Sequence, residues 1–389
     1  NTEPINNSIY GFNFKYDTEV PFFTRLVNKL PNTDTDVESR FSLRGEFAYL
    51  KPGAPKGNEF GGEATTYVDD FEGSQTSISV LNPDSWALSS VPVGFRGPND
   101  TSGNYDVNDD ISINNYRAKL NWYTIDPIFY SSQRPEGISD QDLSQYYSRR
   151  ILINELFPNT DLVPGQIQTI FSLDLHYKPS DRGMYNYNPA ASTDGQLPDP
   201  SQNFGGIMRG LQTTDFERAN VEFVEFWVMD PFIYPENANN NGGKVVLNFG
   251  SISEDILKDG RKQFENGLPE DGGFSNVINT NFAKVPSSQS LVYAFDSEGQ
   301  ARVNQDAGLD GLTNIDEAEK FPQFAGFEDP SQDDFIFYLN ADGGILERYE
   351  KYNGLQGNNP VEVTQNNRGN SAFPDVEDVN RDNTMNTID

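Results

Sequence analysis

Two stretches near the start of the chain alternate strictly between apolar and polar side chains. In Tyr10–Tyr16 every second residue is Tyr or Phe, with Gly, Asn and Lys between them. Phe41–Tyr49 repeats the alternation, with Ser, Arg, Glu and Ala on the polar side. Because successive side chains of a strand point to opposite faces, each stretch predicts a strand with an aromatic and a polar face. This pattern fits outer-membrane barrel strands, although a soluble sheet with one buried face has the same period.

The segment between these stretches has the period of a helix. In Val20–Pro31 the apolar residues fall on one helical face, Pro21 suits the first turn, and Pro31 stops the helix. The pattern predicts a short amphipathic helix. Such a helix lies at a membrane interface or, more commonly, covers a core.

From about residue 65 to 297 the chain alternates short apolar runs with long polar loops rich in Gly and Pro. The candidate strands are Tyr67–Glu72, Tyr116–Ile125, Arg149–Phe157, Thr169–Tyr177, Val221–Met229, Lys244–Phe249 and Leu291–Phe295. Strands without regular helices between them predict a β-sandwich, most simply a jelly roll. Val221–Met229 is apolar on both faces and is predicted to be a central, buried strand. The expected fold class is all-β, with long loops and short helices.

Composition narrows the possible chemistry. Aromatic residues make up 13% of the chain, which argues against disorder. The formal net charge of −31 repels nucleic acid and anionic lipid head groups but suits hard cations such as calcium. The absence of Cys and the single histidine, His176, exclude disulfides, thiolate sites and H-E-x-x-H zinc sites. No run is long enough for a membrane-spanning helix. Since the chain opens on Asn1 and carries no signal peptide, we expect it to be part of a longer polypeptide.

Two acidic segments have the spacing of calcium-binding loops. In Asp378–Asp389 we expect the ligands to be Asp378, Asn380, Asp382, the carbonyl of Thr384, and Asp389. Asn383 stands where such loops have Gly, and Asp389 stands where helix-loop-helix sites have Glu.

In the second loop, Asp306–Glu317, the candidate ligands are Asp306, Asp310, Asn314 and Glu317. Gly308 leaves the third position without a side-chain ligand. The sequence thus predicts structural calcium at either loop, while an acidic turn without a metal ion remains the alternative for both.

Six segments spread over nearly the whole chain carry a resemblance to a known family. They are Gly45–Gly53, Tyr67–Gly73, Glu225–Phe232, Leu247–Ile256, Asp306–Leu312 and Glu377–Thr384. In this order they resemble the SprA/Sov family, the giant outer-membrane translocon proteins of the type 9 secretion system. One segment alone is weak, but the ordered set is specific.

The resemblance implies a large single-chain barrel with soluble insertions, which conducts folded cargo to the cell surface and exports adhesins in gliding species. We therefore expect residues 1–53 to form barrel strands with a short helix. Residues 65–297 are expected to form a jelly-roll-like insertion at the cell surface, with the periplasmic side as the alternative. Residues 298–389 are expected to form an acidic region with calcium-loop-like motifs. The implied partners are other segments of the barrel chain, accessory and plug-like subunits, exported cargo and outer-membrane lipid.

A glycan-binding or adhesive surface module is the main alternative function. It would use exposed aromatic side chains, but Trp227 lies in the predicted central strand. Trp86 and Trp122 are also expected to be buried.

A glycosidase is a third class of function. It needs two carboxylates across a cleft, whereas adjacent pairs such as Asp333-Asp334 are expected by chance among 59 acidic residues. His176 alternates with Ser172 and Asp174 and is predicted to be a solvated strand residue. We expect no enzymatic activity.

Overall fold

The computed structural model describes residues 7–51, 77–95, 110–160, 168–213, 215–219, 221–233, 242–265, 277–282, 284–287, 308–353 and 374–382. The chain divides into two compact units. The first comprises residues 1–76 with 217–221, and the second comprises residues 77–216 and 222–389. The second unit therefore contains segments of both the predicted sandwich and the predicted acidic region.

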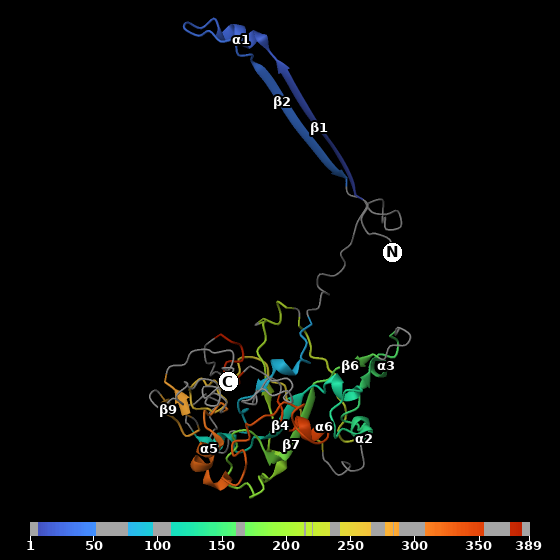
Figure 1. The fold of residues 1–389 in the computed structure, drawn as a ribbon, viewed down its shortest axis with the longest axis vertical. Coiled ribbons are helices and arrows are strands. Elements are labelled where there is room, and N and C mark those ends of the chain that lie inside the picture. Colours follow the sequence, from blue (N-terminus) through green and yellow to red (C-terminus); the bar gives the residue numbers. More distant parts are fainter. Residues whose placement is uncertain are drawn as a thin grey trace. The chain divides into compact units, whose positions relative to one another are not determined.

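A long antiparallel hairpin dominates the first unit (Figure 1). Strands β1 (Ser8–Glu19) and β2 (Arg40–Lys51) pair along their whole length, which confirms the two strands predicted from the alternation. In this register Phe12 lies opposite Phe47 and Lys15 lies opposite Arg44, so the apolar and polar positions of the two strands share faces. The aromatic face consists of Tyr10, Phe12, Phe14, Tyr16, Phe41, Leu43, Phe47 and Tyr49, all exposed.

Helix α1 (Pro21–Val27) lies in the connection between the two strands, where the sequence predicts a helix. Two side chains hold the connection together. The Ser39 amide donates to Thr24 Oγ1 at 2.9 Å, and the Thr35 amide donates to Asn28 Oδ1 at 2.9 Å. None of the α1 side chains is buried, so within the described residues this helix covers no core.

The second unit contains small antiparallel sheets of two strands each. The pairs are β3 (Ala87–Leu88) with β8 (Ile207–Met208), β4 (Ala118–Tyr123) with β7 (Asp174–Arg182), β5 (Ile151–Leu152) with β6 (Thr169–Ile170), and β9 (Val277–Asn279) with β10 (Lys284–Pro286). The α-helices are α2 (Asp140–Ser144), α3 (Ile153–Leu156), α5 (Asn314–Lys320) and α6 (Ile345–Tyr349). Short 3-10 turns are η2 (Pro83–Ser85), η3 (Ile111–Asn114), η4 (Pro127–Tyr130), η5 (Pro200–Gln202) and η7 (Pro322–Phe324). The β-rich expectation is confirmed, but the described residues form neither a closed barrel nor a jelly roll.

Several expected strands differ from the structure. Val221–Met229 forms no strand and is largely exposed, so the prediction of a central buried strand is wrong. Its two-faced apolar pattern signals burial only where other strands cover both faces, and no described strand pairs with it. Arg149–Phe157 is a strand only at Ile151–Leu152 and continues as α3. Tyr67–Glu72 and Leu291–Phe295 lie outside the described residues.

Strand β4 separates two hydrophobic clusters of the second unit. Trp122, fully buried, joins the larger cluster with Phe282 and Leu309. The next residue, Tyr123, points to the opposite side and stacks on Tyr349 at 4.1 Å between ring centroids. Both clusters contain residues from either side of position 297, so the core joins distant parts of the sequence. Among the described residues, no helix combines the length and apolar character needed to span a membrane.

Candidate metal centre

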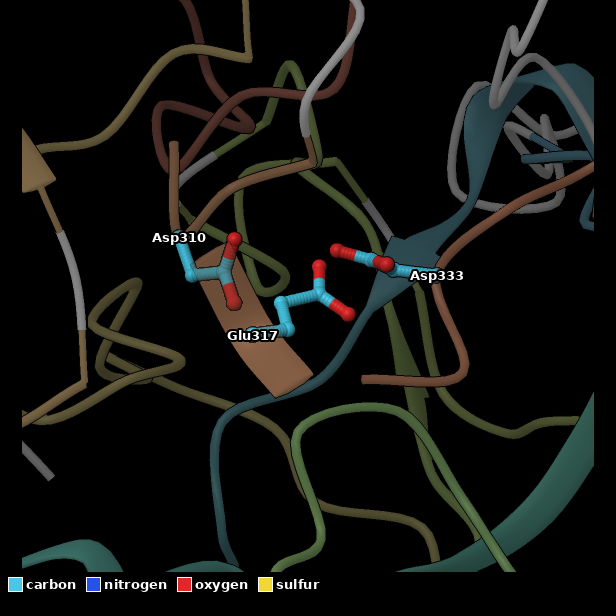
Figure 2. A group of neighbouring side chains, drawn as sticks. All are labelled: Asp310, Glu317 and Asp333. Atoms are coloured by element: carbon cyan, nitrogen blue, oxygen red, sulfur yellow. The ribbon is translucent and has the colours of Figure 1, made fainter. Parts of the chain in front are cut away.

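Three buried carboxylates converge in the second unit (Figure 2). Asp310 follows a glycine-rich turn, Glu317 projects from α5, and Asp333 lies in a turn after that helix. One oxygen from each side chain lies within 4.8 Å of the other two. Their exposures are 0% for Asp310, 1% for Glu317 and 7% for Asp333, so the cluster is shielded from water.

The local sequence explains how Asp310 and Glu317 reach one site. Gly308 and Gly311 adopt left-handed conformations, at φ +60° and +64°, and turn the chain on either side of Asp310. Thr313 then caps α5 by accepting from the Asp316 amide at 3.3 Å. One turn into the helix, Glu317 faces inward.

Hydrogen bonds orient two of the three carboxylates. Asp310 Oδ1 accepts from the Leu312 amide at 3.0 Å. Asp310 Oδ2 accepts from the hydroxyls of Ser331 at 3.1 Å and Tyr187 at 3.3 Å. Glu317 Oε2 accepts from the Ser331 amide at 2.9 Å. Ser331 thus links Asp310 to Glu317.

Asp333 is held by its backbone rather than by its carboxylate. Its amide donates to Asp329 Oδ1 at 3.2 Å, but its Oδ2 is buried without a hydrogen-bond partner. This oxygen lies against Gly308, where a Cβ atom would come within 1.8 Å of it. The missing side chain at position 308 therefore makes room for the Asp333 carboxylate.

Burial dominates the electrostatics of the cluster. It raises the pKa of Asp310 to about 7, and burial together with the charge of Asp310 raises the pKa of Glu317 to about 9. Burial and the charge of Glu317 raise the pKa of Asp333 well above its usual range. None of the three carboxylates forms an ion pair with a described residue. At neutral pH the cluster must therefore keep protons or accept a cation.

The other predicted loop is only partly described. Asp378 Oδ1 and Asn380 Oδ1 both accept from the Asp382 amide, at 3.0 and 2.9 Å, so these three predicted ligands share one turn. Lys262 Nζ lies 3.9 Å from Asp378 Oδ2 and gives this fully buried carboxylate a counter-charge. Thr384 and Asp389 lie outside the described residues.

The structure brings together only two of the ligands predicted for Asp306–Glu317. Asp310 and Glu317 meet in the cluster, Asp306 lies outside the described residues, and the Asn314 amide group donates to Asp334 Oδ2 at 2.7 Å. Asp333 is a member of this site that was not predicted from the sequence. Its only signal is the acidic turn that starts at Asp329, and no loop spacing connects that turn to Asp310.

Two other predicted positions behave differently from expectation. His176 is half-buried in β7 and its Nδ1 has no partner, so the solvated histidine was a wrong prediction. Burial and the neighbouring Lys178 lower its pKa. Trp227 is 66% exposed, whereas Trp122 is fully buried as expected.

Comparison with known proteins finds a family similarity in the last part of the chain. Residues 309–389 match the SprA_N family model, which is described as motility related/secretion protein. No curated protein matches the chain. The matched segment contains α5, α6 and all three clustered carboxylates. Over residues 309–389 the chain is similar to the SprA_N family of motility-related and secretion proteins, which supports the SprA/Sov resemblance for this segment.

Proposed function

We propose that this chain is a structural, non-catalytic segment of the protein-conducting outer-membrane channel of the type 9 secretion system. The family match supports a role in motility or secretion. The observation that carries the more specific proposal is the hairpin of β1 and β2, which exposes one aromatic face and one polar face. We assign it to the wall of the channel, with the aromatic face toward lipid.

The aromatic face would be costly for a hairpin alone in water. Phe12 is 62% exposed and Phe47 is 54% exposed, although their rings contact each other at 5.5 Å between centroids. An isolated two-stranded hairpin is marginally stable in water even without such exposure. Lipid would cover this face without requiring any further protein layer.

The polar face suits a water-filled lumen. Lys15 lies directly opposite Arg44, a like-charge pair that destabilises a dry interface. Here Lys15 Nζ pairs with Asp17 Oδ2 at 2.9 Å, and both side chains are about half exposed. Strands of 12 residues also exceed the roughly 9–11 residues that a tilted barrel strand needs to cross a bilayer.

The unpaired edges of the hairpin indicate that it needs neighbouring strands. Among the described residues, β1 and β2 pair only with each other, so each strand has one edge with unpaired backbone groups. Such edges are costly inside a bilayer and must pair with further strands. In this proposal, other segments of one longer polypeptide supply those strands. Exported cargo passes the polar face, and accessory or plug-like subunits are the further partners of this proposal.

Single cysteines test the proposal, because the native chain has none. In the full-length protein in intact outer membranes, Phe12→Cys and Phe47→Cys should react with a membrane-confined probe. Asn13→Cys and Glu46→Cys, the matched controls from the next paired positions, should react with an aqueous probe. Equal aqueous access at all four positions would exclude a lipid-facing hairpin.

We further propose that the second unit lies at the cell surface, since barrel insertions are usually longest there. A protease site inserted between Thr193 and Asp194, which are both exposed, should be cut in intact cells. Cleavage that appears only after the outer membrane is disrupted would place the unit in the periplasm instead.

The exposure of Trp227 favours one second candidate, a glycan-binding surface. Its ring lies 6.4 Å from that of Phe157, at 83°, and offers a face for stacking on sugars. Under this alternative the protein is retarded in polysaccharide-containing native gels, and Trp227→Ala abolishes the retardation. Under the channel proposal neither protein is retarded.

A further inference from the structure

We propose that Asp310, Glu317 and Asp333 bind one calcium ion that cross-links the second unit. This inference does not depend on the channel proposal, since the three side chains belong to the second unit and the channel argument rests on β1 and β2. The ligand set also differs from the one expected from the sequence. Asp333 is a ligand that lies outside the predicted loop Asp306–Glu317.

No cationic side chain of the described residues pairs with the three carboxylates. The three carboxylates lie together at 7% exposure or less, without an ion pair to any described residue. Lys320 is close enough to act on Asp310, but its ammonium group donates to the Thr280 carbonyl at 2.9 Å. A divalent cation is the simplest group that removes the repulsion among three clustered carboxylates.

Asp333 brings a buried oxygen without a hydrogen-bond partner to the cluster. A buried carboxylate oxygen without any donor carries a desolvation cost of roughly 1–3 kcal/mol or more. Asp333 Oδ2 is such an atom, and the Asp333 side chain is turned toward Glu317 and Asp310 in Figure 2. Oxygens of this kind are satisfied by a hard cation. The hydrogen bonds to Asp310 and Glu317 hold the other two carboxylates ready for the same ion.

The all-oxygen ligand set suits calcium, whose coordination is more flexible than the strict octahedron of magnesium. Ligands on opposite sides of Ca²⁺ are about 4.6–5.2 Å apart, whereas those around Mg²⁺ are at most about 4.2 Å apart. The three oxygens lie within 4.8 Å of one another, a separation that the ligands of one calcium ion can span. Zinc prefers nitrogen and sulfur ligands, and the site offers only oxygen.

The proposed ion would join α5 to the turn before it and to the segment after it. Asp310 lies before α5, Glu317 lies on α5, and Asp333 follows the segment in which the Ser331 carbonyl accepts from the Tyr185 amide at 2.9 Å. Calcium would therefore attach α5 and its flanking turns to the core residues around Tyr185. Ligand linkage predicts that stability grows with the logarithm of free calcium over its Kd.

Calcium titration of the whole chain after chelation tests the site. Thermal unfolding should shift upward with calcium in the wild type, and isothermal titration should give a calcium affinity at least tenfold weaker in Asp333→Asn and Glu317→Gln. The matched controls are Asp334→Asn and Glu319→Gln, which alter exposed neighbours in the same turn and the same helix. Both controls should keep the affinity and the shift of the wild type.

The unfolding temperature without calcium separates a lost ligand from a damaged fold. Asp333→Asn replaces a carboxyl group that is costly to ionise when buried, so its metal-free unfolding temperature should equal or exceed that of the wild type. Terbium, excited through tyrosine, should luminesce on wild-type protein near Tyr185 and Tyr187, and calcium should displace it far better than magnesium. Unchanged calcium affinity in both variants, or no calcium effect on the wild type, would overturn the proposal. Neither result would affect the labelling of the hairpin.

Discussion

At the residue scale, burial changes the acid–base behaviour of side chains that the sequence presents as ordinary strand residues. Asp174 begins β7 and is largely buried. Burial raises its pKa from the usual 3.8 to about 6, although the Ser172 hydroxyl donates to its carboxylate at 3.2 Å. A raised pKa means that the folded state favours the protonated carboxyl group. The resulting stability is present below pH 3.8 and is lost as the pH rises through about 6.

We therefore expect Asp174→Asn to stabilise the fold at pH 8 but not at pH 4. The gain at pH 8 should be roughly 2–3 kcal/mol at most, the cost of ionising the buried carboxyl group. Urea unfolding at both pH values measures it. The exposed Asp194→Asn variant serves as a control and should unfold like the wild type at either pH. Equal effects of Asp174→Asn at pH 4 and pH 8 would contradict the argument.

At the element scale, buried carboxylates hold together segments without regular secondary structure. Glu377 accepts from the amides of Ile256 at 2.7 Å, Leu257 at 3.1 Å and Gln263 at 3.0 Å. Glu254 accepts in turn from the Val379 amide at 2.9 Å. These bonds replace a sheet ladder, because the isolated bridge between Phe264 and Val376 is the only β-pairing between these segments among the described residues.

Glu377→Gln should accordingly destabilise the second unit by roughly 1–3 kcal/mol, since the amide nitrogen cannot accept and leaves a buried N–H without a partner. Hydrogen exchange should accelerate first at Gln263, whose amide donates to the oxygen Oε2. Glu328→Gln changes an exposed glutamate and is the control. If both variants exchange alike at Gln263, the carboxylate does not hold these segments together.

In the hairpin, contact between the two strands explains a break in the alternation of aromatic and polar residues. Gly45 interrupts the aromatic face of β2, and the ring of Phe14 on β1 lies over it. A Cβ atom at position 45 would come within 2.2 Å of that ring. The absence of a side chain at Gly45 thus leaves room for the Phe14 ring to cover the backbone of β2. Aromatic residues cover glycines in other sheets in the same way.

At the scale of the whole molecule, two units with different solvent requirements share one chain. The second unit buries two aromatic and aliphatic clusters, whereas the hairpin leaves its large apolar side chains exposed. We expect a chain starting at residue 77 to fold in buffer and to keep the unfolding temperature of its own core. A peptide of residues 7–51 should lack stable β-structure in buffer and gain it in detergent micelles.

Circular dichroism of the two pieces, with near-ultraviolet signals for the second unit, measures this difference. Detergent should change the spectrum of the peptide strongly and that of the larger piece little. A hairpin equally ordered in buffer and in micelles would remove the need for lipid on its aromatic face.

The sequence by itself determined the features that depend on local periodicity. The alternation in Tyr10–Tyr16 and Phe41–Tyr49 predicted two paired strands, and the helical spacing after Pro21 predicted α1. A period of two or 3.6 residues sets the direction of each side chain without reference to the rest of the chain. The ordered motifs likewise indicated a family that the match over residues 309–389 supports.

Only the tertiary structure decided which residues meet. It joined Asp333 to Asp310 and Glu317, and it left Val221–Met229 exposed although its pattern favours burial. Neither result is encoded in a local period, because burial depends on which distant segments cover a residue. The three carboxylates come close enough to share one metal ion only when the folded chain brings their segments together. The hairpin was therefore predictable from its own residues, while the candidate metal centre required α5, the turn before it and the segment after it to fold against one another.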